Sequence, residues 1–136
     1  MKKFKFLEHT ADIKFQAFGS SLEKAFENSA LALVEVMTKK TKIKAIIKKK
    51  IKVEGKDNES LLYSFLEEFL FLFDSEGFVL SNVNKIKIKD RKLEAEVVGD
   101  KAENYKISQD VKAITYNSMF VREEKGNVII QVVLDV

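Results

Sequence analysis

The chain has 136 residues, of which 46% are hydrophobic and 33% are charged, a balance typical of one domain built around one core. It contains no cysteine, which excludes disulfides, zinc–thiolate sites, iron–sulfur clusters and a cysteine nucleophile. Five glycines and no proline leave no room for a Gly-rich phosphate loop or a flexible linker. We therefore expect residues 1–136 to form a single domain.

The formal net charge of +3 conceals an uneven distribution of charged residues. Eight lysines fall between Lys39 and Lys52 without an acidic residue among them, which leaves 16 basic and 21 acidic residues in the rest of the chain. This pattern predicts a mildly acidic body with one basic patch, suited to an acidic partner or a phosphate backbone. No hydrophobic run reaches the length of a membrane span, and residues 1–6 are too short for a signal peptide, so we expect a cytoplasmic protein with no membrane partner.

The N-terminal third of the sequence predicts two strands and a helix. Hydrophobic residues alternate over residues 4–6 and 13–17, which favours extended strands. Ser20 and Glu23 have capping-box spacing, and hydrophobic residues then recur every three or four positions over residues 22–37. We expect a helix there.

The middle of the chain predicts a lysine-rich strand followed by a long helix. Residues 42–54 alternate Ile or Val with Lys, and the breaks in this period at residues 46–47 and at Lys49 favour a β-bulge. Either residue of the pair 57–58 can cap the second helix, which has a broad hydrophobic face and ends at Gly77.

From Phe78 onward the hydrophobic period returns to two. It predicts a strand over residues 78–88, a turn at 90–92, a return strand over 93–97 and an extended piece from Tyr105 to Ile107.

The C-terminal residues predict a hairpin, with arms over residues 111–121 and 128–136 around a loop at 123–127. The last arm is hydrophobic on both faces except at Gln131, so it should lie centrally in a sheet. Two helices over a mostly antiparallel sheet make the predicted fold class α+β.

Three oxygen donors are candidate metal ligands. Asp12 stands at the start of a strand, on the opposite face from Ile13, and Asp135 follows a hydrophobic run. Val136 adds an α-carboxylate beside Asp135, and donors that are all oxygen select Ca²⁺, Mg²⁺ or Mn²⁺. The simpler interpretations are a turn cap for Asp12 and a frayed end for Asp135.

A second group of functional side chains lies between Asp110 and Asn117. On a strand, Lys112 and Tyr116 share one face, while Thr115 lies on the other. An ordinary surface strand explains the same residues. His9 is the one histidine of the chain, and no Gly-x-Ser-x-Gly elbow accompanies it, so a hydrolase triad is not expected.

Three motifs together resemble the archease family: residues 9–13 (His-Thr-Ala-Asp-Ile), residues 111–116 (Val-Lys-Ala-Ile-Thr-Tyr) and the ending 133–136 (Val-Leu-Asp-Val). The similarity extends over the whole chain. One position departs from the family, which usually has a histidine where this chain has Asn117.

The resemblance implies a non-catalytic protein cofactor of the GTP-dependent RNA ligase that joins a 2′,3′-cyclic phosphate or 3′-phosphate end to a 5′-hydroxyl end, as in tRNA splicing. Such a cofactor promotes guanylylation and multiple turnover of the ligase, and its association with tRNA is indirect, through the ligase. The resemblance further implies a divalent-metal site, usually calcium, formed by Asp12, Asp135 and Val136. It assigns Lys112, with Asp12, to ligase activation, and we place His9, Thr115 and Tyr116 as residues that support this site.

Other functions remain open from the residues alone. The lysine-dense segment suits a stand-alone RNA-binding module, although the acidic remainder and the scarcity of aromatic pairs count against it. A chaperone-like role is a further alternative. A metal-dependent phosphohydrolase has too few candidate ligands and no evident general base.

Overall fold

The computed structural model describes residues 2–7 and 12–136. In chain order its elements are β1 (Phe4–Leu7), β2 (Ile13–Gly19), α1 (Leu22–Thr38), β3 (Ile47–Glu54), α2 (Asn58–Glu76), β4 (Phe78–Lys89), β5 (Lys92–Lys101), the short 3₁₀ helix η1 (Ala102–Asn104), β6 (Ala113–Glu124) and β7 (Asn127–Asp135). None of the described helices is long and apolar enough to cross a bilayer.

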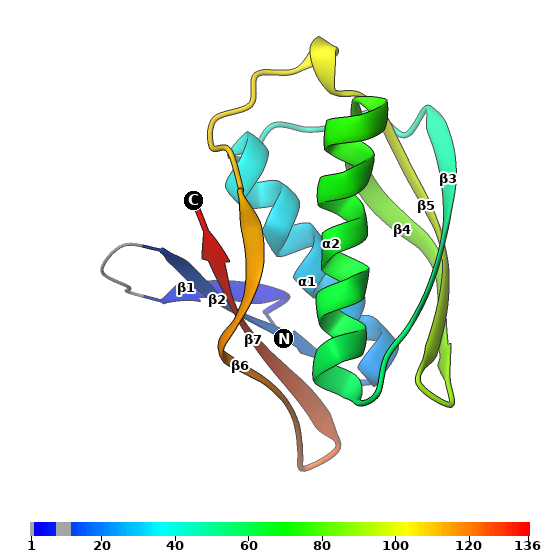
Figure 1. The fold of residues 1–136 in the computed structure, drawn as a ribbon, viewed down its shortest axis with the longest axis vertical. Coiled ribbons are helices and arrows are strands. Elements are labelled where there is room, and N and C mark those ends of the chain that lie inside the picture. The colour runs from blue at the N-terminus through cyan, green and yellow to red at the C-terminus, as the bar shows by residue number, and fades with distance from the viewer. Residues whose placement is uncertain (1, 8–11) are drawn as a thin grey trace.

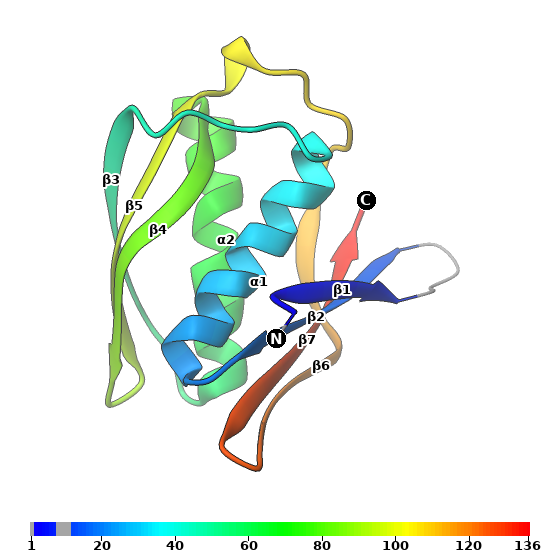
Figure 2. The ribbon, with the colours of Figure 1, turned by 180° about the vertical axis from the view of Figure 1, so that it is seen from behind.

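The strands form two antiparallel sheets, with the two helices between them (Figures 1 and 2). One sheet has the order β1-β2-β7-β6 and the other the order β3-β5-β4. The predicted α+β class with two helices on antiparallel strands is confirmed, although the strands divide into two sheets where one was expected. The central position predicted for the last strand is also confirmed, because β7 pairs with β2 on one side and β6 on the other.

The helix α2 supplies much of the hydrophobic core. Asp57 caps its first turn by accepting a hydrogen bond from the Ser60 backbone N–H at 2.7 Å, and Gly77 ends it with a φ of 62°. Phe65 is fully buried at its centre, where its ring lies against Phe26 of α1, with the ring centroids 5.8 Å apart. The long apolar face expected from the sequence therefore packs against α1 and both sheets.

The helix α1 covers the predicted residues, but its capping residue lies one position later than predicted. Ser21, and not Ser20, is the cap, because its hydroxyl accepts a hydrogen bond from the Lys24 backbone N–H at 3.1 Å. The helix ends at Thr38, where Lys39 adopts a left-handed conformation with φ 45°.

The strand predicted over residues 42–54 is shorter and more regular than expected. β3 begins at Ile47 and pairs with β5 without a bulge; the register shifts of this sheet lie in β4. Lys49 interrupts the hydrophobic alternation because its Nζ forms an ion pair with Glu76 of α2 at 2.6 Å. Before the strand, Ile43 is buried, and its carbonyl accepts a hydrogen bond from the Ser81 hydroxyl at 2.7 Å. Ile43 is therefore buried in the connection between α1 and β3, outside the strand.

The turn predicted between residues 90 and 92 is confirmed as a two-residue connection. Asp90 and Arg91 have φ values of 52° and 57°, the left-handed pair of a type I′ hairpin, and Lys92 already belongs to β5. The C-terminal hairpin is confirmed as well, but its strands reach Glu124 and begin again at Asn127.

The segment after η1 runs without forming a strand and is attached to the core through Tyr105. The Tyr105 hydroxyl donates to the Asp100 carboxylate at 2.7 Å and accepts from the Lys44 backbone N–H at 3.0 Å. Asp100 is buried, and the hydrogen bond from Tyr105 is the main cause that lowers the pKa of its carboxyl below 3.8. One hydroxyl therefore joins the β5–β6 connection both to β5 and to the connection between α1 and β3.

Tyr105→Phe should lower the midpoint of thermal unfolding at neutral pH. A carboxyl whose pKa is lower in the folded state contributes stability above its unfolded pKa and loses that contribution as the pH falls through the folded value. The difference between wild type and variant should therefore shrink below about pH 4, and only the part due to the unbonded Lys44 N–H should remain. Thermal melts between neutral and acidic pH test this; a difference that is independent of pH would contradict it.

Candidate functional site

Three segments that are far apart in the sequence meet at one end of the four-stranded sheet. Ile13 of β2 pairs with Leu134 of β7, so Asp12 and Asp135 are neighbours across the two strands, each one residue beyond that pair. On the other side of β7, Ala113 pairs with Asp135. The Lys112 backbone N–H donates to the Asp135 carbonyl at 2.8 Å. The register thus brings together the first motif, the second motif and the chain end.

At this end of the sheet, one face is buried against the core and the other is open to solvent. Leu134 and Phe15 are fully buried on the core face, whereas Asp135 is exposed and Asp12 is half-buried. Strand alternation places the Asp135 side chain on the face opposite Leu134. The α-carbon of Val136 is held in place, because its half-buried side chain packs against the core. The carboxylates therefore lie at the surface on a rigid support.

The donor set fits a hard divalent cation in chemistry but is small. It consists of oxygens only, which is the preference of Ca²⁺ and Mg²⁺. Within residues 2–7 and 12–136, no three side chains of Asp, Glu or His lie close enough together to hold a metal ion. A site at Asp12 and Asp135 therefore needs a donor other than a described side chain, and the α-carboxylate of Val136 adjoins Asp135.

We call the sheet end that carries Asp12, Asp135 and Val136 the carboxylate end, and Lys112 lies next to it. Its side chain is exposed, while the preceding Val111 is buried and fixes the segment to the core. Its backbone is joined to Asp135 by the hydrogen bond described above. An ammonium group on a mobile stem is thus attached to the same strand end as the two aspartates.

The remaining predicted site residues have different surroundings. The Thr115 hydroxyl donates to the Val133 carbonyl at 3.0 Å, which fastens β6 to β7 two residues before Asp135. Tyr116 turns toward α2, where its ring stacks on Tyr63 with centroids 4.4 Å apart and planes inclined by 6°. His9 lies outside the described residues.

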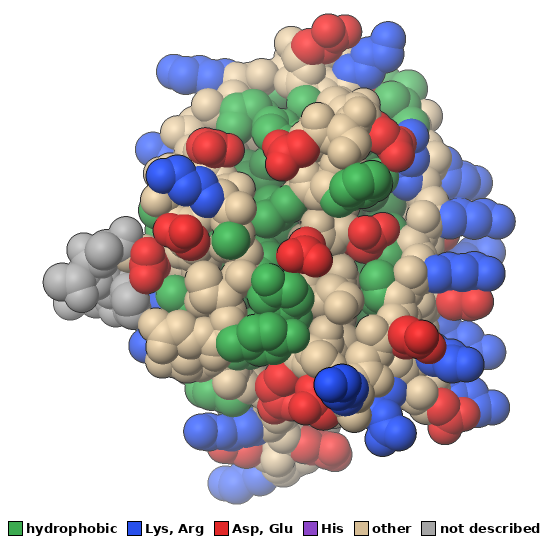
Figure 3. All heavy atoms as spheres, viewed as in Figure 1, with side chains coloured by type: hydrophobic (Ala, Val, Ile, Leu, Met, Phe, Trp, Pro, Cys, Tyr) green, Lys and Arg blue, Asp and Glu red, His purple; other side chains and the backbone are tan. Residues whose placement is uncertain are grey.

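The Tyr63–Tyr116 stack was not predicted, and it lies on an acidic surface. Burial is the main cause that raises the pKa of both phenols, and the charge of Glu67 raises both further. Figure 3 shows acidic side chains spread over this side of the molecule, and lysines and arginine gathered along the side formed by the other sheet. The stack joins α2 to β6, two elements far apart in the sequence, so no local spacing could have predicted it.

A wide bulge in β6 follows Thr115. The register shifts from Thr115 opposite Val133 to Phe120 opposite Gln131, so residues 116–119 face a single residue of β7. Ser118 has a φ of 56°, and its carbonyl accepts a hydrogen bond from the Gln131 side chain at 2.8 Å. Bulges re-aim side chains, and this one carries Tyr116 and the exposed Asn117.

Comparison with known proteins gives a consistent result. Residues 4–136 match the Archease protein family. The chain is 44% identical over 142 residues to "Protein archease" of Pyrococcus furiosus, with 100% of each chain covered, and 37% identical over 140 residues to "Protein archease" of Methanothermobacter thermautotrophicus, with 99% of each covered.

Two solved structures share the fold. The solution structure of Methanobacterium thermoautotrophicum protein 1598 has a TM-score of 0.85 and 37% identity, covering 100% of both chains. The crystal structure of an archease from Thermotoga maritima, described as a possible chaperone, has a TM-score of 0.64 and 23% identity, covering 97% of this chain and 96% of that one. At that identity the second likeness concerns the fold alone.

Proposed function

The chain belongs to the archease family, and we propose from this that it is a non-catalytic protein cofactor of a GTP-dependent RNA ligase that joins 2′,3′-cyclic phosphate or 3′-phosphate ends to 5′-hydroxyl ends, as in tRNA splicing. The observation that carries the proposal is the convergence of Asp12, Lys112 and Asp135 at one exposed sheet end.

Asp12, Asp135 and the α-carboxylate of Val136 would hold a divalent cation, with calcium favoured and magnesium or manganese as alternatives. Their mutual repulsion favours a cation, because three anionic groups on adjacent strand ends destabilise one another without one. When bound, the cation supplies positive charge that offsets the negative charge of a nucleoside triphosphate. The pairing of β2 with β7 would bring the three groups together before a cation binds.

Lys112 would contribute the second positive charge. Its exposed ammonium can reach a phosphate group or an acidic side chain of the ligase, while its backbone bond to Asp135 keeps it beside the carboxylates. Val111 is buried and holds the backbone of this segment against the core, so the exposed lysine side chain extends from a fixed point.

The location of this end suits insertion into a partner. Figures 1 and 2 place the C-terminal end of β7 at the surface, across the two helices from β3. We propose that this tip docks near the nucleotide pocket of the ligase. Contact through the tip would leave the three-stranded sheet uncovered.

Single-turnover guanylylation of the partner ligase, measured with and without this protein, tests the proposed function. We expect faster formation of the ligase–GMP adduct and more turnovers per ligase in a multiple-turnover joining assay. Equal adduct rates together with equal turnover numbers would contradict it.

A further inference from the structure

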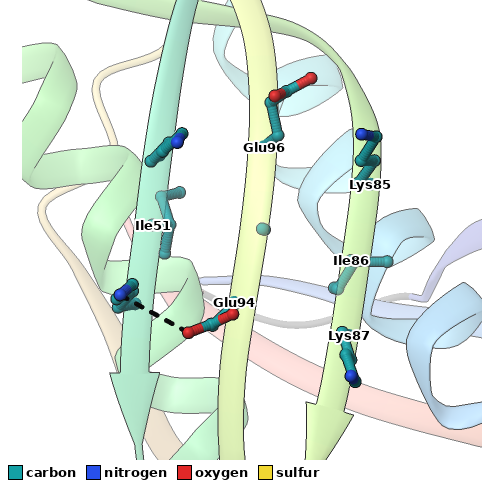
Figure 4. Close-up of a pocket in the computed structure, with 9 residues that line it drawn as sticks. Ile51, Lys85, Ile86, Lys87, Glu94 and Glu96 are labelled. Atoms are coloured by element: carbon teal, nitrogen blue, oxygen red, sulfur yellow. Dashed lines mark ion pairs between the residues drawn. The ribbon is translucent and has the colours of Figure 1, made fainter.

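The three-stranded sheet has one face against the helices and one face open to solvent. Residues that point inward on β5, such as Leu93 and Ala95, are buried in the core. The pairing register places lysines and glutamates together on the open face (Figure 4). They are Lys48, Lys50, Lys52 and Glu54 on β3, Lys85, Lys87 and Lys89 on β4, and Lys92, Glu94 and Glu96 on β5. We call this set the lysine face.

The charges of the lysine face form ordered columns. Lys50 and Lys85 flank Glu96 in one row, and the next row repeats the arrangement around Glu94. The face has four more lysines than glutamates, whereas the net charge of the whole chain is only +3. Among the described residues, the ion pairs on this face join Glu96 to Lys48 at 3.8 Å and Glu94 to Lys52 at 3.6 Å. The lysines of β4 form none of these ion pairs, so their ammonium groups are available to bind an anionic ligand.

The geometry of the lysine face suits an extended polyanion. Neighbouring strands lie about 4.8 Å apart, so the lysine columns of β3 and β4 are separated by about 10 Å, with a repeat of about 6.8 Å along each strand. A shallow trough of about 430 Å³ lies between them, lined by Lys50, Lys52, Lys85, Lys87, Glu94 and Glu96 among others. Because a lysine stem is longer than that of glutamate, the ammonium groups can extend beyond the central carboxylates and reach a ligand first.

The composition of the face favours a phosphate backbone over an acidic protein. Protein interfaces depend on buried aromatic or aliphatic anchors and are depleted in lysine, whereas nucleic-acid interfaces are polar and positively charged. Of the large hydrophobic side chains exposed in the described part of the chain, only Ile46 adjoins this face, one residue before β3. No aromatic ring offers a stacking platform there, so bases would not be read.

We propose that the lysine face binds the phosphate backbone of a nucleic acid strand without sequence preference. The proposal does not depend on the ligase. The lysine face and the carboxylate end lie on opposite sides of the helices (Figures 1 and 2), so both can be occupied together.

Fluorescence anisotropy of a short labelled RNA strand of mixed sequence, without ligase, tests the proposal. We expect micromolar affinity that falls steeply with salt, and similar affinity for DNA of the same sequence. Replacing Lys50, Lys52, Lys85 and Lys87 together by Gln should weaken binding roughly tenfold or more and reduce the slope of log K against log salt by about 3, since each contact to a single strand contributes about 0.7.

The matched control removes the same charge elsewhere. Lys3, Lys56, Lys106 and Lys125 are exposed and lie outside the lysine face, and their joint replacement by Gln should leave most of the binding intact. Replacing the four lysines of the trough by Arg keeps the charge and should preserve binding, which guards against a folding defect in the Gln variant.

Equal losses of RNA affinity in the two Gln variants would overturn the proposal. Binding of the wild type to polyglutamate or to anionic phosphatidylserine vesicles but not to RNA would overturn it as well. Ligase activation without RNA binding would also overturn it and leave the proposed function standing.

Discussion

Replacing Asp135 or Asp12 by alanine should abolish stimulation of ligase guanylylation and leave the fold intact. Asp135 is exposed and Asp12 half-buried, so neither change opens a cavity, and removing one carboxylate relieves repulsion within the cluster. Loss of one of the three proposed ligands should weaken calcium binding by about tenfold or more. Isothermal titration with calcium or magnesium, adduct formation by the ligase and thermal unfolding measure the three effects.

Two further variants sharpen this experiment. Asp90→Asn removes one negative charge at the β4–β5 turn, far from the carboxylate end, and should behave as wild type in all three assays. Appending a few residues after Val136 replaces its free carboxylate by a neutral amide and should impair activation as the Asp135 change does. Should these chains and the wild type all bind metal and activate alike, the three-carboxylate site would be wrong, and Lys112 would become the better candidate for ligase activation.

Phe65→Ala should destabilise the protein by about 3–5 kcal/mol, because it leaves a cavity where close-packed rings now meet. Phe65 is fully buried, with Phe26 at 5.8 Å and Phe69 at 5.0 Å between ring centroids. Urea unfolding followed by circular dichroism gives the difference in the free energy of unfolding. Phe65→Leu fills most of the cavity and should cost clearly less. A loss from Phe65→Ala below about 1.5 kcal/mol would mean that the core collapses around the vacancy.

The elements that could be predicted from sequence are those whose signals are local. The second helix has a capping residue at Asp57, a hydrophobic face of the correct period and a glycine stop at Gly77, and all three appear in α2. The β4–β5 hairpin and the hairpin of β6 and β7 are likewise defined by short turns between alternating strands. Each of these signals lies within a few residues of the structure that it specifies.

The errors arose where distant residues decide the outcome. The start of the lysine-rich strand was misplaced because Ile43 is buried in the connection before the strand, where its carbonyl accepts a hydrogen bond from Ser81, 38 residues away. A bulge was expected at Lys49 because nothing near it in sequence shows the ion pair with Glu76. The bulge in β6 is real but had no local signal, since its shape depends on the hydrogen bond between the Gln131 side chain and the Ser118 carbonyl.

The sequence by itself supplied the candidate site residues and determined that two helices pack on antiparallel strands, because residue type and hydrophobic period are local properties. Only the tertiary structure decided which of those residues are neighbours. Asp12 and Asp135 are adjacent because the second strand pairs with the last, and the lysines of β3 and β4 share a face because both strands pair with β5. The register of strand pairing is set by burial of one face of each sheet, a condition that the whole chain satisfies at once.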